Sequence, residues 1–105
     1  EYTLPKYWGA DKYTAQEGYC AISGILMRKP IRTWDPYGPS IDRIDSNLGY
    51  TPQNCQLTTF AVNRAKNQMS HDELLEFCEG VVRKHRRTKK EQIVKNQTPR
   101  KLQTK

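Results

Sequence analysis

Two polar residues, Asp42 and Asn63, have types and surroundings that could let them share a metal ion. Asp42 lies in Ser40–Ile44, where polar and apolar residues alternate as they do in a half-buried strand. Asn63 lies in a later segment that follows a helix-capping residue. Carboxylate and carboxamide oxygens suit a hard cation such as Mg²⁺. If the strand and the later segment pack together, they predict a divalent-metal site at a strand–helix junction.

The residues around this pair predict a strand, a loop, a second strand and a short helix. Turn-forming residues occupy 45–49, Pro52 excludes a helix at that point, and Cys55–Thr58 alternates again. Thr59 can then N-cap a helix over 60–67. The packed side of this helix is expected to comprise Phe60, Ala61, Ala65 and Met69.

From about Cys20 to Lys66 the chain resembles the ββα-metal, or HNH, nucleases in their phage-type form. The matching residues read S-I-D-R-I-D at 40–45, G-Y-T-P-Q-N at 49–54 and N-R-A-K at 63–66. Together with the flanking patterns, the resemblance implies a small α+β fold with a ββα-metal (His-Me finger) core. A β-hairpin precedes this core, and a C-terminal helix and a basic tail follow it. The implied activity is that of a metal-dependent DNA endonuclease, which nicks or cleaves phosphodiester bonds.

The resemblance also assigns roles to individual residues. It implies that Asp42 and Asn63 hold one Mg²⁺ or Mn²⁺ ion and that Asn54 fixes the loop. Arg43 stands where many family members have the histidine that activates water. Arginine stays protonated, so we expect Arg43 to clamp the scissile phosphate, which leaves water activation to the metal, Asp45 or the substrate. The candidate catalytic residues are Asp42, Arg43, Asn54 and Asn63.

The positive charge of the chain is concentrated near its C-terminus. Residues 83–105 carry ten Lys and Arg and one acidic residue, whereas residues 1–82 carry eight basic and ten acidic residues; the net charges of +9 and −2 sum to +7. Such a basic segment attracts polyanions, and double-stranded DNA is the partner that we expect. The candidate nucleic-acid contacts are Arg28, Lys29, Arg64, Lys66, Arg83, Lys84, Arg86, Arg87, Lys89 and Lys90.

Two other functions stay open at this point. The arginine in place of the histidine favours a catalytically silent DNA-binding module built on an HNH scaffold. The basic tail and the N-terminal aromatic residues would also suit a phage interaction protein that docks on a host protein. The sequence contains no legible dimer interface, so the oligomeric state is not predicted.

The chain is expected to form one domain with two appendages. Residues 1–19 read as an aromatic flap with a short helix from Asp11 to Gln16, residues 20–87 as the nuclease-like domain with a capping helix, and residues 88–105 as a flexible basic tail. Inside the domain, Cys20–Met27 reads as an apolar hairpin that turns near Gly24. Trp34 is expected to anchor the core. The capping helix should begin after Ser70, end near Arg87 and extend further on DNA.

The cysteines and the hydropathy bear on the compartment. Cys20, Cys55 and Cys78 are an odd number without a C-x-x-C pair, which favours buried free thiols over a structural zinc site. The mean hydropathy is −0.92, and the sequence contains neither an apolar membrane span nor a signal-peptide pattern. We therefore expect a cytoplasmic protein, in the bacterial host cell if it is phage-encoded.

Overall fold

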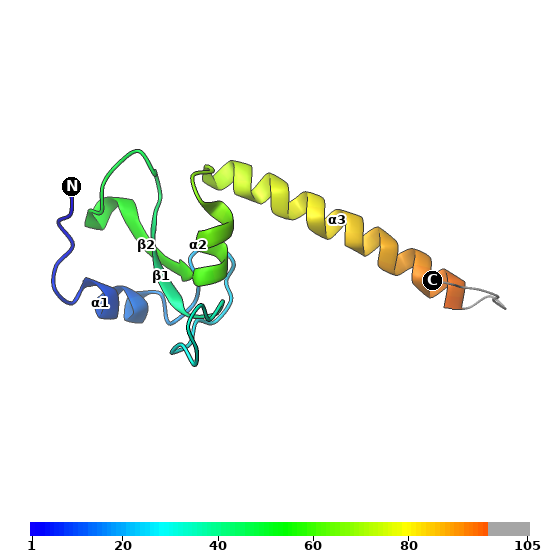
Figure 1. Ribbon diagram of the computed structural model, residues 1–105, viewed down its shortest axis with the longest axis horizontal. Coiled ribbons are helices and arrows are strands. Elements are labelled where there is room, and N and C mark those ends of the chain that lie inside the picture. Colours follow the sequence, from blue (N-terminus) through cyan, green and yellow to red (C-terminus); the bar gives the residue numbers. More distant parts are fainter. Residues whose placement is uncertain (97–105) are drawn as a thin grey trace. The chain divides into compact units, whose positions relative to one another are not determined.

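The computed structural model describes the backbone of residues 1–96 and the side chains of residues 1–86. This part of the chain has an α+β fold with three α-helices and a two-stranded sheet (Figure 1). The elements in chain order are α1 (Trp8–Ala15), β1 (Pro39–Arg43), the 3-10 turn η1 (Pro52–Asn54), β2 (Cys55–Thr59), α2 (Phe60–Lys66) and α3 (His71–Asn96). Glu1–His71 forms one compact unit, and the described residues after it, 72–96, belong to a second.

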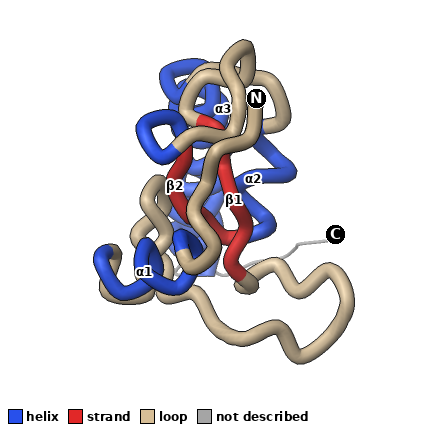
Figure 2. Tube along the Cα trace, turned by 90° about the vertical axis from the view of Figure 1, so that its left-hand side faces the viewer, coloured by secondary structure: helices blue, strands red, loops and turns tan. Residues whose placement is uncertain are grey.

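β1 and β2 are antiparallel neighbours, and their register fixes the geometry of the site. Ile41 lies opposite Leu57, Asp42 opposite Gln56 and Arg43 opposite Cys55. Figure 2 shows the two strands side by side, with α2 next to them. The predicted strands are confirmed to within one residue at their ends. Both faces of the sheet are covered, since Leu57 and Thr58 point to opposite faces of β2 and are both buried.

The core of the first unit joins α1 to the sheet. Five side chains are buried together in it: Trp8, Cys20, Met27, Cys55 and Leu57. The predicted start of the first helix was wrong: α1 begins at Trp8, and the N–H of Asp11 already donates to the Tyr7 carbonyl. Burying the indole of Trp8 outweighs the capping preference of an aspartate in this helix.

The predicted hairpin at residues 20–27 forms as a tight turn. The Cys20 N–H donates to the Ile25 carbonyl at 2.8 Å, and Tyr19 and Leu26 make a single antiparallel bridge. Gly24 has a φ of +72°, a conformation that glycine adopts without strain. The turn brings Cys20 and Met27 into the core as free-thiol and thioether groups.

The loop before β1 is organised by Asp35, and the prediction that Trp34 anchors the core was wrong. The Asp35 side chain is buried and accepts four hydrogen bonds, two from Arg28 and one each from the N–H groups of Ile31 and Tyr37. Trp34, at a φ of +66°, is 64% exposed. Since a buried carboxylate needs several donors, the loop folds around Asp35 and turns the adjacent indole outward.

α2 begins as predicted but buries a different face. The Thr59 hydroxyl accepts from the Val62 N–H at 3.3 Å, which confirms the N-cap. The predicted packed side was wrong for Ala61 and Ala65, which are exposed, whereas Val62 packs on the core and Lys66 is buried. The buried polar partner available to Lys66 decides which face of this two-turn helix turns inward.

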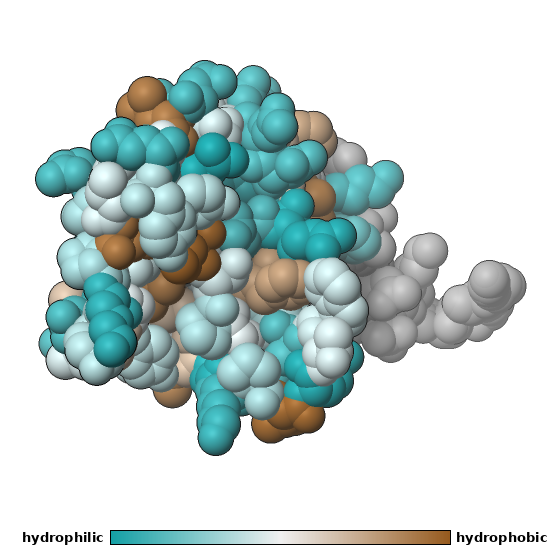
Figure 3. Space-filling view, turned by 60° about the vertical axis from the view of Figure 1, so that its left-hand side comes forward, coloured by the Kyte–Doolittle hydropathy of each residue, from teal (hydrophilic) through white to brown (hydrophobic). Residues whose placement is uncertain are grey.

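α3 is longer than the sequence pattern predicts, and most of the large apolar side chains described in it are exposed. It continues past Arg87 to Asn96, so the predicted extension is part of the helix without DNA. Phe77 and Val81 are exposed, and the Cys78 thiol, predicted to be buried, is exposed as well. Figure 3 shows one face of the molecule, on which hydrophilic residues predominate and apolar residues form smaller groups. Within residues 1–96, no helix combines the length and apolar character needed to cross a membrane.

Candidate functional site

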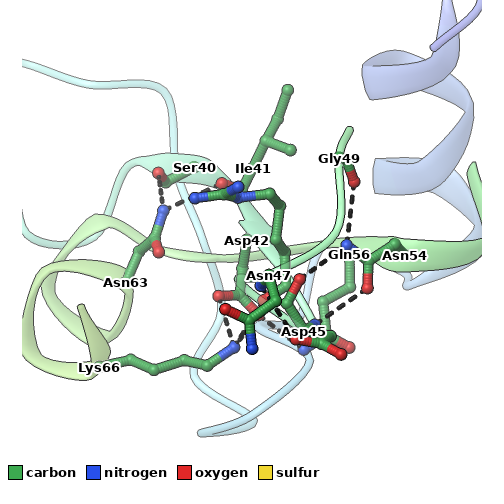
Figure 4. A network of polar contacts seen from close by, with 11 residues as sticks. Ser40, Ile41, Asp42, Asp45, Asn47, Gly49, Asn54, Gln56, Asn63 and Lys66 are labelled. Carbon is green, nitrogen blue, oxygen red and sulfur yellow. Dashed lines mark hydrogen bonds and ion pairs between the residues drawn. The ribbon is translucent and has the colours of Figure 1, made fainter. Parts of the chain in front are cut away.

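The candidate site is a polar cluster at the junction of β1 and α2. The carboxylate of Asp42 is 3% exposed and accepts hydrogen bonds from the Lys66 ammonium at 2.9 and 3.1 Å. The Gln56 side chain, directly across the sheet, donates to the same carboxylate at 3.0 Å. Figure 4 shows these three side chains directed toward one another. The hydrogen-bond donors to the Asp42 carboxylate are therefore side-chain groups, those of Lys66 and Gln56.

Lys66 completes the cluster from the helix. Its ammonium also donates to the Arg43 carbonyl at 2.8 Å, so three oxygen atoms converge on one cation. The residue is only 1% exposed. The prediction that Lys66 grips a DNA backbone requires an exposed ammonium, and the structure instead buries that group against Asp42.

A buried ion pair of this kind holds its elements firmly but adds little net stability. The cost of removing two charges from water nearly cancels their attraction, whereas loss of one partner leaves an uncompensated buried charge. Removal of either Asp42 or Lys66 alone is thus expected to cost about 3–5 kcal/mol. The pair joins α2 to β1. Because burying two charges gives little net stability, a functional role for the pair is worth testing.

Asn63 lies near Asp42 in space, but its side chain bonds to the two residues that precede Asp42 in the chain. The amide nitrogen of Asn63 donates to the Ser40 hydroxyl at 2.6 Å and to the Ile41 carbonyl at 3.0 Å (Figure 4). The predicted junction of strand and helix therefore forms. Asn63 is bonded to the two residues before Asp42, and the direct partner of the carboxylate is Lys66.

Asn54 fixes the loop between the strands. Its amide oxygen accepts from the Asp45 N–H at 2.9 Å, and its amide nitrogen donates to the carbonyls of Asp45 and Gly49. Asn54 is buried, and its three bonds join the start of the loop at Asp45 to its later part at Gly49. These bonds account for the loop-fixing role that the motif implies for this residue; orientation of a catalytic base stays a prediction.

Arg43 is the last residue of β1, and Asp45 lies in the loop that follows it. The Arg43 guanidinium donates to the Leu48 carbonyl at 3.1 Å and lies over the Tyr50 ring, 5.0 Å from its centroid. The Asp45 carboxylate is exposed and accepts from the Asn47 N–H. A phosphate clamp by Arg43 stays a prediction, as does water activation by Asp45.

The other predicted nucleic-acid contacts fall into three groups. Arg28 is bound to Asp35 through two hydrogen bonds, and Arg64 lies over the rings of Trp34 and Phe60. Exposed side chains on the surface comprise Lys29, Arg83, Lys84 and Arg86. Side chains outside the described part of the chain comprise Arg87, Lys89 and Lys90.

The oxygen atoms of the cluster are of the chemical type that binds hard cations. Two carboxylate oxygens and one backbone carbonyl already surround the Lys66 ammonium, and hard oxygen donors of this type are those that Mg²⁺ prefers. Both hydrogen bonds of the Asn63 side chain use its amide nitrogen, so its amide oxygen is the atom that would serve a metal. Among the residues with described side chains, no three His, Cys, Asp or Glu gather into a metal-binding group. A divalent ion at Asp42 would have to replace Lys66.

Sequence reasoning missed the partners of Asp42 and the exposure of Trp34. One signal for Lys66 was present, because residues three apart share a helix face and Lys66 follows Asn63 by three. The register of the two strands, which a sequence does not supply, was needed to place Gln56 opposite Asp42.

No family model matches the chain, and searches of curated proteins and of solved structures find no match either. What can be inferred about function therefore comes from the motif at residues 40–66 and from its contacts.

Proposed function

We propose that the chain is a metal-dependent DNA endonuclease of the HNH type, acting through the cluster around Asp42. One observation carries the proposal. The buried carboxylate of Asp42, on the first strand of a β–β–α unit, and the Arg43 carbonyl together surround a cation, the Lys66 ammonium. The residues of the proposed motif, from Ser40 to Lys66, supply this group and the loop beside it. The high positive charge of the chain adds to the case for a nucleic-acid partner.

In this proposal the ββα unit is formed by β1, β2 and α2, and Asp42 and Asn63 would hold one Mg²⁺ or Mn²⁺ ion. Such an ion, when bound, supplies a Lewis acid that stabilises the charge developing on a phosphodiester. The chain's own residues do the positioning. Asn54 holds the loop, Gln56 orients the Asp42 carboxylate through its hydrogen bond, and Arg43 offers a fork of donors to a phosphate.

Lys66 acts in this proposal as a built-in counter-ion. While no metal is bound, its ammonium neutralises Asp42 and prevents a buried unpaired charge. A divalent ion at this site would be held by the Asp42 carboxylate, and the Lys66 side chain would have to turn away from it on its flexible four-carbon stem. The ion must therefore compete with Lys66, and removing the lysine charge should raise metal affinity.

A catalytically silent DNA-binding module is the second candidate, and two observations favour it. Arg43 stands at the motif position of the water-activating histidine, and the Asp42 carboxylate is already paired with the Lys66 ammonium. In that case the Asp42–Lys66 pair would serve only to join α2 to β1. Binding without cutting is the behaviour that separates this candidate from the nuclease.

The test is nicking of supercoiled plasmid by the full chain with Mg²⁺ or Mn²⁺. The double variant Asp42→Asn/Lys66→Met removes both charges together and so avoids leaving one of them buried and unpaired. We expect it to lose nicking by at least about 100-fold, a loss typical of removing one group that stabilises a transition state. Its retention of plasmid in a gel shift should stay close to that of the wild type.

Asp35→Asn is the matched control, because Asp35 is the other buried carboxylate bound to a base in the same unit. Folding of each variant is checked by circular dichroism. Nicking by the double variant at the wild-type rate would rule out the site. A wild-type protein that shifts plasmid without nicking it under any divalent ion would favour the silent module.

A further inference from the structure

Trp34 occupies a position that an aromatic residue rarely takes. Its indole is 64% exposed, and its φ of +66° is a conformation that bulky side chains adopt at an energetic cost. Burial of the indole would have been the more favourable use of so much apolar surface. The surrounding loop, held by Asp35, maintains the outward position.

The exposed indole forms a cluster with two residues of α2, Phe60 and Arg64. Its ring centroid lies 5.3 Å from that of Phe60 at an interplanar angle of 51°, and the Arg64 guanidinium lies 5.2 Å from the Trp34 ring and 5.6 Å from the Phe60 ring. Two main-chain bonds hold the loop to the helix start: the Phe60 N–H donates to the Gly38 carbonyl and the Ala61 N–H to the Pro36 carbonyl. These bonds hold the loop, and with it Trp34, against the start of α2.

We propose that Trp34, Phe60 and Arg64 form a platform on which an unpaired nucleobase of DNA stacks. Exposed aromatic rings offer a π-surface that every base can use, and a neighbouring arginine adds attraction for the phosphate of the same nucleotide. Arg64 directly follows Asn63 on α2, so the platform and the Asp42 site are connected through one helix. The platform rests on the proposed function only in taking DNA as the partner.

The test is binding of three labelled probes by fluorescence anisotropy at low salt without divalent ions. The probes are a twelve-residue oligothymidine, the same backbone with abasic sites in place of the bases, and a twelve-base-pair duplex. Wild-type protein should prefer the oligothymidine to the abasic strand. Trp34→Leu should weaken oligothymidine binding by about 5- to 100-fold, and should change abasic binding by less than twofold.

Two controls separate stacking from other causes. Ile31→Ala removes another exposed apolar side chain of the same loop and should leave all three affinities unchanged. Trp34→Phe keeps a ring and should retain most of the affinity, which also shows that the position tolerates substitution. Arg64→Gln should weaken binding of the oligothymidine and of the abasic strand, because the phosphates are common to both.

Equal binding of oligothymidine by Trp34→Leu and wild type would overturn the platform, as would equal wild-type affinity for the abasic strand and the oligothymidine. A loss on Trp34→Leu that is as large for the duplex as for the oligothymidine would also overturn it, since paired bases cannot stack there. Plasmid nicking separates the two proposals. Trp34-dependent binding without nicking removes the nuclease and keeps the platform, whereas nicking with no Trp34 effect does the reverse.

Discussion

Asp35 and Asp42 are both buried carboxylates that face a basic side chain, yet they are held in different ways. Asp35 accepts two bonds from Arg28 and two from backbone N–H groups, and the Arg28 side chain is 47% exposed. Asp42 accepts from Lys66 and Gln56, and its basic partner is as buried as Asp42 itself. In the described residues, the first carboxylate is tied to the main chain and the second to side chains.

The difference indicates which carboxylate can exchange its partner. Backbone N–H groups cannot leave Asp35 without unfolding its loop, so this residue is suited to a structural role. The side chains around Asp42 can rotate away while the strand stays in place, which suits a group that binds a cation. Burial alone would not distinguish the two residues, but the identity of their donors does.

The largest expected effect comes from removing each basic partner in turn. Lys66→Met leaves Asp42 charged in a buried position and should lower the free energy of unfolding by about 3–5 kcal/mol. Arg28→Met should cost much less, because Asp35 keeps its two N–H donors and the arginine is half exposed. Chemical denaturation of both variants measures this.

The double variant Asp42→Asn/Lys66→Met provides the control for this comparison. It removes both charges and should recover much of the stability that Lys66→Met loses. Equal losses for Lys66→Met and Arg28→Met would contradict the distinction between the two carboxylates.

A smaller loss is expected at the loop that follows β1. Asn54→Ala removes three hydrogen bonds made by a buried side chain and leaves main-chain groups of Asp45 and Gly49 without these partners, which should cost about 2–4 kcal/mol. Gln53→Ala, at the exposed neighbouring position, should change stability by less than about 0.5 kcal/mol. Similar unfolding midpoints for the two variants would mean that Asn54 does not hold the loop.

The smallest expected effect is a pH dependence of stability that comes from Asp35. Hydrogen bonds from Arg28 and from the Tyr37 N–H lower the pKa of Asp35 from its ordinary value of 3.8 to about 2. A carboxyl group with a lowered folded-state pKa contributes stability above pH 4, and this contribution is lost as the pH falls toward 2. Asp35→Asn should therefore reduce the unfolding temperature at pH 6, and the difference from wild type should shrink between pH 4 and pH 2.

Circular dichroism melts at several pH values measure this difference. A constant difference between Asp35→Asn and wild type from pH 6 to pH 2 would show that the charge of Asp35 has no part in holding the loop.

The sequence predicted the elements of the site better than its contacts. Local signals sufficed for β1, β2 and the Thr59 cap, because alternation and capping depend on residues close in the chain. Lys66 and Asp42 are brought together by the docking of α2 on the sheet, which is a tertiary event. A lysine in a basic protein is expected at the surface, and that expectation concealed a lysine that is only 1% exposed.

Trp34 illustrates the same limit for apolar residues. Large aromatic residues are usually buried to a great extent, so a core position was the natural expectation. The neighbouring residue Asp35 outweighs this preference, because its buried carboxylate requires four hydrogen-bond donors and the loop folds to supply them. No local pattern reports such a competition between neighbouring residues.

The most direct test of the account is a crystal structure of the protein soaked in Mn²⁺, with anomalous diffraction to locate the ion. We expect an anomalous peak bonded to the Asp42 carboxylate, with the Lys66 ammonium moved away from it and the Arg28–Asp35 contacts unchanged. A structure in which Lys66 still binds Asp42, with no anomalous peak beside that carboxylate at saturating Mn²⁺, would contradict the account.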